Sequence, residues 1–179
     1  MQFALCLISG YATRHHYRHG GGGSNILCLP EEPQWRNHTT GNPASGWLYG
    51  TAYALRGGHA TFFSTVNTGG RLLHHTPVPC AVCYVSQRSA SVMIPAATGC
   101  PVGWTPEYGG YLMSGHSYDD NKQNPRHPTT YICVDQAPEI ARGVYQAQSW
   151  LLFVKVGCGI LPCSHFPNGW ELACIVCTK

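Results

Sequence analysis

Residues Pro79–Cys83 read PCAVC and residues Ala173–Cys177 read ACIVC, and these two segments point to the fold class. Each is a short apolar run with Cys-x-x-Cys spacing, which we interpret as a strand. On a strand, side chains at positions i and i+3 point to opposite faces. The two cysteines of each pair should therefore bond different partners and clamp both faces of a sheet.

Paired Cys-x-x-Cys segments also suit structural zinc, which needs four ligands converging on a tetrahedron. Here the two pairs lie far apart in strand-like segments, and six further cysteines among the 10 also need partners. A redox Cys-x-x-Cys normally opens a helix, and no helical pattern follows either pair. We therefore predict disulfides, about five in number and of unassigned pairing. Their members are Cys6, Cys28, Cys80, Cys83, Cys100, Cys133, Cys158, Cys163, Cys174 and Cys177.

This density of cysteine is typical of secreted proteins, and the glycosylation sequon at Asn37 fits the same environment. The opening MQFALCLISGYA has no basic residue and only a short apolar run, so it is a poor signal peptide. We interpret Phe3–Ile8 as part of a first strand and the chain as a mature extracellular domain.

The rest of the chain repeats the same design, with short apolar runs between clusters of Gly, Pro and Asn. We predict one all-β domain over residues 1–179, irregular, antiparallel and rich in loops. Long loops are expected at His19–Asn25, Pro30–Gly46 and His116–Pro128, and one or two helical turns within Pro138–Gln148. The expected strands are Phe3–Ser9, Ile26–Leu29, Trp47–Ala54, Ala81–Val85, Ser91–Ile94, Tyr111–Met113, Thr130–Val134, Trp150–Val156 and Glu171–Thr178.

The composition narrows the classes of partner. Only 11% of the 179 residues are charged, against about 25% in average domains. No apolar run reaches the roughly 18 residues of a membrane span, so none is predicted. The net charge is +3, and the basic residues are scattered apart from Arg14–His19. Nucleic-acid binding, which needs a dense basic stripe, is therefore not expected, although the histidines of Arg14–His19 suggest pH-sensitive binding.

Catalytic motifs are weak. The run His19–Gly23 resembles an esterase oxyanion loop, but the G-x-S-x-G elbow that accompanies it is missing. Glu107 facing Asp119 or Asp120 would suit a glycosidase, which needs two nearby carboxyls. The Asp119-Asp120 pair also suits calcium or simple solvation of a loop. We predict no enzyme, no catalytic residue, no cofactor and no metal site.

The segment Gly103–Tyr111, GWTPEYGGY, is the most suggestive of binding. Aromatic rings stack on the C–H faces of sugars, while carboxylates and amides bind the hydroxyls. Core packing beside Cys100 is the alternative for Trp104 and Tyr111. The predicted carbohydrate contacts, which include the polar loop that follows, are Trp104, Glu107, Tyr108, His116, Asp119, Asp120 and Asn121.

Five segments also carry a family resemblance. The chain resembles the C-terminal non-collagenous domain of the short-chain (sponge-type, spongin-like) collagens and related invertebrate lectin-like proteins. This resemblance implies a secreted matrix or cell-surface protein and supplies no catalytic residue; Cys6 lies at its edge. The chain lacks a collagen repeat, so a fibre-forming role is not expected. The matching segments are LISGYATRHHYRHGGGGSNILCLP (Leu7–Pro30), VPCAVC (Val78–Cys83), MIPAATGCPVGWTPEYGGYLMSG (Met93–Gly115), YICVDQAPE (Tyr131–Glu139) and CGILPCSHFPNGWELACIVCTK (Cys158–Lys179).

Three functions remain open. The favoured one is a secreted lectin that binds glycans or glycoproteins and forms a homo-oligomer for avidity. The alternative is a structural or assembly module of the extracellular matrix without sugar binding. A secreted hydrolase is the third, and its turnover would be lost in Glu107→Gln.

Overall fold

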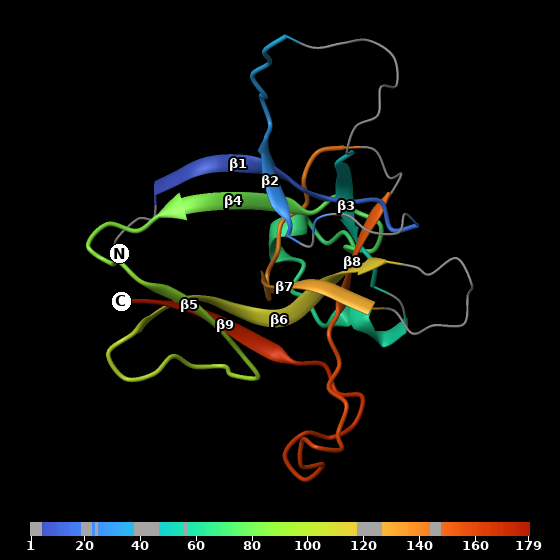
Figure 1. The fold of residues 1–179 in the computed structure, drawn as a ribbon, viewed down its shortest axis with the longest axis vertical. Coiled ribbons are helices and arrows are strands. Elements are labelled where there is room, and N and C mark those ends of the chain that lie inside the picture. Colours follow the sequence, from blue (N-terminus) through green and yellow to red (C-terminus); the bar gives the residue numbers. More distant parts are fainter. Residues whose placement is uncertain are drawn as a thin grey trace.

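The protein is an all-β domain built on one curled, mostly antiparallel sheet (Figure 1). The computed structural model describes residues 5–18, 23, 25–37, 47–55, 57–117, 127–143 and 148–179, without the side chains of 116, 117 and 127–129. The elements are β1 (Leu5–Arg14), β2 (Leu27–Pro30), β3 (Tyr49–Tyr53), the 3-10 helices η1 (Gly57–Thr61) and η2 (Val66–Thr68), β4 (Pro79–Tyr84), β5 (Ser91–Pro95), β6 (Thr105–Ser117), β7 (His127–Asp135), β8 (Ser149–Phe153) and β9 (Ala173–Thr178).

The sheet folds back on itself. Its strand order is β2-β1-β3-β8-β6-β9-β5, with β4 added beside β1 and β7 beside β6. The pairings are antiparallel except β3 with β8, which is parallel. In Figure 1 one arm, β1 with β4, lies above the other arm of β5, β6 and β9, and β3 and β8 link the two.

The main core lies where the two arms are joined. It contains Tyr53 of β3, Met113 of β6 and Leu151 of β8, each at most 1% exposed. Phe63 and Phe153 stack beside it, with ring centroids 5.5 Å apart. A second, smaller cluster on the other side of β6 contains Leu112 and the Cys133–Cys174 disulfide. β6 therefore carries buried side chains on both of its faces.

The five disulfides confirm the prediction drawn from the Cys-x-x-Cys segments. Within β4, Cys80 bonds Cys28 and Cys83 bonds Cys6. Within β9, Cys174 bonds Cys133 and Cys177 bonds Cys100. The fifth bridge joins Cys158 to Cys163 in the loop between β8 and β9. Each Cys-x-x-Cys strand is thus tied through both faces to two different parts of the chain.

The nine predicted strands are all present, but some bounds differ. β6 runs over Thr105–Ser117 instead of Tyr111–Met113, because pairing with β9 and β7 carries the strand through its proline and glycines. The predicted helical turn is wrong for residues 138–143, where the structure shows no helix, while 144–147 lie outside the described residues. Much of the three predicted loops also lies outside the described residues. The two ends of the predicted loop His116–Pro128 belong to β6 and β7.

The basic segment Arg14–His19 does not form an exposed patch at its start. Arg14 is fully buried and His15 is 9% exposed. Nη1 of Arg14 donates to the carbonyl oxygen of Trp150 at 3.3 Å, and Nη2 lies 3.1 Å from Nε2 of His15. Burial lowers the pKa of Arg14 to about 10. Arg14 therefore joins β1 to β8, and His15 packs beside it.

Candidate functional site

The predicted sugar contacts begin at Trp104, just before β6, and continue in sequence through β6 to residue 121. Asp119, Asp120 and Asn121 lie outside the described residues, and for His116 only the backbone, within β6, is described. Glu107 and His116 are nine positions apart on this strand. At about 3.3 Å per residue their Cα atoms are separated by up to roughly 30 Å. The structure therefore separates His116 from the Glu107 end of the predicted surface by more than the width of one sugar ring.

The carboxylate of Glu107 has protein partners. It forms an ion pair with Arg88 at 2.8 Å and accepts a hydrogen bond from the hydroxyl of Thr178. Both ionic side chains are mostly buried, at 15% and 23% exposure. This arrangement joins the β4–β5 connection to β6 and β9, so the Glu107 side chain supports the fold at this point. Trp104 lies half-buried in the loop before β6, which the Cys100–Cys177 disulfide anchors to β9.

Tyr108 offers the better-placed aromatic surface. Its ring is 39% exposed, and its hydroxyl donates a hydrogen bond to the carbonyl oxygen of Cys133 at 3.3 Å. That bond joins the Tyr108 side chain to the backbone of β7, while part of the residue stays open to solvent. Burial raises the pKa of Tyr108, and the negative charge of Asp135 raises it further. The phenol is therefore a neutral hydrogen-bonding group at physiological pH.

Asp135 is the carboxylate beside this ring. It lies directly opposite Gly110 in the β6–β7 ladder, and Gly110 is two residues along β6 from Tyr108, so all three lie on one face. One carboxylate oxygen of Asp135 accepts the backbone N–H of Ala137 at 2.9 Å. The residue is exposed, and among the residues that the structure describes the second oxygen forms no hydrogen bond. We call Tyr108, Gly110 and Asp135 the Tyr108 platform.

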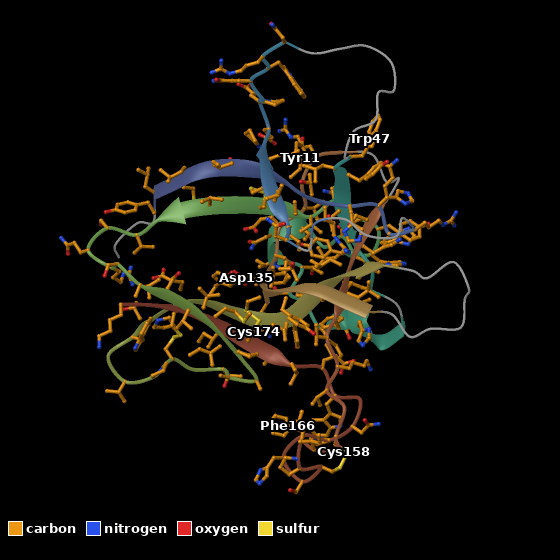
Figure 2. The ribbon with its side chains drawn as sticks, in the orientation of Figure 1. Tyr11, Trp47, Asp135, Cys158, Phe166 and Cys174 are labelled. Atoms are coloured by element: carbon orange, nitrogen blue, oxygen red, sulfur yellow. A yellow bond between two sulfur atoms is a disulfide. The ribbon has the colours of Figure 1, made fainter. Side chains whose placement is uncertain are left out.

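The backbone beneath the Tyr108 platform is rigid. The Cys133–Cys174 disulfide joins β7 to β9 on the platform's face of β6, and Figure 2 shows Cys174 and Asp135 over this part of the sheet. A Cβ at Gly110 would collide with the carbonyl oxygen of Val134, so this position is kept free of a side chain. The backbone of β7 thus packs closely against Gly110, and the Tyr108 ring and the Asp135 carboxylate are the groups of the platform that reach solvent.

A concave region lies on the other arm. A hollow of about 300 Å³ is bordered by Tyr11 of β1, Thr51 of β3, and Arg142 and Gln148 of the segment before β8. Tyr11 is labelled in Figure 2 beside β1. Among the described residues that line the hollow, one is a cation, Arg142, and none is a carboxylate. The aromatic–carboxylate combination expected of a sugar site is thus found at the Tyr108 platform and not in this hollow.

A further polar cluster consists of His59, Lys155 and Glu171. Nε2 of His59 lies 2.5 Å from Glu171, whose same oxygen accepts from Lys155 at 2.8 Å. Burial by itself would raise the pKa of Glu171, but the hydrogen bonds from Lys155 and His59 outweigh it and lower the pKa to about 2. Within the described part of the chain no hydroxyl or thiol is hydrogen-bonded to His59. The cluster is therefore an ion-pair network that ties η1 to the β8–β9 connection.

The described residues contain no group of three or more His, Cys, Asp or Glu side chains placed to hold a metal ion. No helix in the described part of the chain is both long and apolar enough to cross a membrane.

Sequence reasoning placed Tyr108 in the candidate site but missed Asp135. Asp135 ends the run YICVD of β7, and nothing local distinguishes it from the other carboxylates. The β6–β7 register places it opposite Gly110. The five disulfides indicate an oxidising, extracellular environment. No protein-family model matches the chain, and no solved structure matches it, so the resemblance to the short-chain collagen domain stays a prediction.

Proposed function

We propose that this protein is a secreted carbohydrate-binding protein that recognises glycans at the Tyr108 platform. The observation that carries the proposal is the half-exposed Tyr108 ring beside the Asp135 carboxylate, on a face that a disulfide holds rigid. A sugar ring stacks its C–H face on the tyrosine, and its hydroxyls donate to the carboxylate oxygen. A preformed site loses little conformational entropy on binding, which matters for weakly bound sugars.

Within this proposal the other predicted contacts have different roles. Trp104 remains a candidate for contacting the next sugar of a chain, because it lies in the loop immediately before β6. Glu107 acts indirectly, since its pair with Arg88 holds the start of β6 in place. His116, Asp119, Asp120 and Asn121 remain candidate contacts only for a long glycan, given the length of the strand.

The first experiment is a glycan-array screen of the native, oxidised protein with and without a chelator. Selective binding that a free sugar competes away is expected, and the chelator should leave it unchanged. Loss of binding with chelator would place a metal at the site and contradict the direct mode proposed here. A blank array from folded protein would overturn the glycan-binding proposal.

The site is then tested by three substitutions and one control. Tyr108→Ala removes the stacking surface and Asp135→Asn the charged acceptor, and each should weaken binding about tenfold. Tyr108→Phe keeps the ring and should retain most of the affinity. Trp35→Ala is the matched control, because Trp35 is an 80% exposed aromatic in the β2–β3 connection.

Isothermal titration calorimetry with the sugar found on the array measures these effects, and circular dichroism confirms folding. Unchanged binding by folded Tyr108→Ala would eliminate the Tyr108 platform. In that case Arg142→Gln tests the hollow on the other arm, which Arg142 borders.

The alternative function, a structural or assembly module without sugar binding, is supported by a different feature. β1 and β4 form a ribbon whose apolar side chains are exposed. This ribbon is compatible with either function, because lectins also assemble to gain avidity.

A further inference from the structure

The ribbon formed by β1 and β4 carries a continuous apolar face. Leu5 is opposite Tyr84, and Ile8 is opposite Val82. Val82 and Tyr84 are two positions apart on β4, so these four side chains lie on the same face. Leu7 lies at the bulge between the two pairs. The five side chains are between 36% and 64% exposed.

This apolar face is an extension of the core side of the sheet. Farther along the same strands it continues through Cys80, which packs against the main core, and Ala12, which is 3% exposed within that core. In Figure 1, β1 and β4 run on together past β2 and β3 toward the end of the domain. The apolar surface of these two strands thus extends past the part that packs against the core.

The outer strand of the ribbon, β4, also has few of the features that prevent an edge strand from pairing with another chain. Its two sequences, LCLISGY (5–11) and PCAVCY (79–84), contain no charged residue. Among the described residues β4 pairs with β1 alone, so its outer edge is open. Soluble proteins usually protect such an edge with lysine, a bulge or proline. In β4 the only proline, Pro79, begins the strand, and the bulge of the ribbon has its extra residue in β1.

The opposite face of the ribbon is cross-linked. Cys6 lies opposite Cys83 and is bonded to it, which places the disulfide on the side away from Leu5 and Val82. The ribbon is therefore pre-shaped, and little conformational freedom is lost when a partner covers it. At roughly 200 Å² for a large apolar side chain, the five exposed groups offer about 500 Å². Two such faces together reach the roughly 1,000 Å² that a specific interface requires.

We propose that a second copy of this chain covers this apolar face, ribbon against ribbon, in a two-fold symmetric homodimer. A two-fold contact needs a self-complementary surface, and an uncharged apolar face satisfies this without like-charge repulsion. The open edge of β4 adds main-chain donors and acceptors beside the contact. This inference stands on the ribbon and does not depend on glycan binding.

Sedimentation velocity of the oxidised protein over a concentration series tests the proposal. The wild type should sediment as a dimer at tens of micromolar, a concentration at which a small apolar interface is occupied. Tyr84→Lys and Val82→Lys each place a charge in the contact and should raise the dimer dissociation constant at least about tenfold. Both positions are exposed in the monomer, so the variants should fold. Val102→Lys is the matched control, because Val102 lies in the loop before β6 and is fully exposed.

Two results would overturn the proposal: a monomeric wild type at the highest concentration, or a dimer that survives both ribbon substitutions in folded protein. The glycan-binding proposal is tested separately on the monomeric Val82→Lys protein. In solution that variant should bind a monovalent sugar with the affinity of the wild type. On a dense glycan array it should bind more weakly than the wild type, because a monomer has no avidity. A dimer that binds no sugar would refute the function and leave the interface standing.

Discussion

The disulfides close loops of very different length, and this predicts unequal contributions to stability. Cys158 and Cys163 are 5 residues apart, whereas Cys133 and Cys174 are 41 apart. Chain-entropy stabilisation grows with the logarithm of loop length, which gives about 2 kcal/mol for the short loop and about 4 kcal/mol for the long one. The pair Cys133→Ala with Cys174→Ala should therefore cost about twice as much as the pair Cys158→Ala with Cys163→Ala.

Burial widens this difference. Cys133 is 8% exposed and Cys174 is 1% exposed, so replacing both with alanine also leaves unfilled space beside the Tyr108 platform. Each lost sulfur adds about 1 kcal/mol, which brings the total to about 6 kcal/mol. That loss is comparable to the whole stability of a typical domain. The Cys158–Cys163 variant should stay folded, with its Tm lowered by roughly 4–8 °C.

Urea unfolding of the non-reduced proteins, followed by tryptophan fluorescence and far-UV circular dichroism, measures both free energies. Because Tyr108 donates to the carbonyl oxygen of Cys133, the long-loop variant should also lose glycan affinity, and the short-loop variant should not. Equal losses in the two variants, or a larger loss from the Cys158–Cys163 pair, would refute the loop-length and burial reasoning.

Three further outcomes are expected. Gly115→Ala should lower the free energy of unfolding by about 1–3 kcal/mol, because the new Cβ collides with the buried guanidinium of Arg14; an unchanged thermal melt would contradict this packing. Since the pKa of Glu171 is lowered to about 2, its stabilisation is complete above its unfolded pKa and is lost as the pH falls from about 5 to 2. Urea titrations across that range should show that the free energy of unfolding changes less with pH in Glu171→Gln than in the wild type. Identical pH profiles would disprove the stabilising role of the Glu171 carboxylate. Glu107→Gln should cost about 1–3 kcal/mol by depriving the mostly buried Arg88 of its charge partner, with glycan affinity retained in calorimetry; lost affinity in a folded variant would make Glu107 a direct contact.

Prediction from sequence succeeded where the signal was local. The apolar runs ending in Ile94 and Val134 predicted strands, and β5 and β7 contain them. It failed on the length of β6, because Pro106 and the glycines at 109 and 110 read as strand breakers. Pairing with β9 and β7 supplies the hydrogen bonds that keep this segment extended.

The candidate site was predictable only in part. Tyr108 stood out as an aromatic among glycines, and its half-exposed ring supports its place in the proposal. Glu107 was the natural acidic companion on sequence grounds, yet Arg88, distant in sequence, pairs with it. Asp135 lies beside the Tyr108 ring instead, and this depends on the register between two strands.

The sequence by itself determined the class of this protein. Short apolar runs and an even number of cysteines, ten, indicate a disulfide-bonded β domain of an oxidising environment, because strand formation and cysteine oxidation follow from local residue type and cysteine count. Only the tertiary structure decided which cysteines bond, which carboxylate meets the aromatic ring, and which apolar face extends past the core. These three depend on register and on how the sheet curls, and both are set by contacts between residues far apart in the chain.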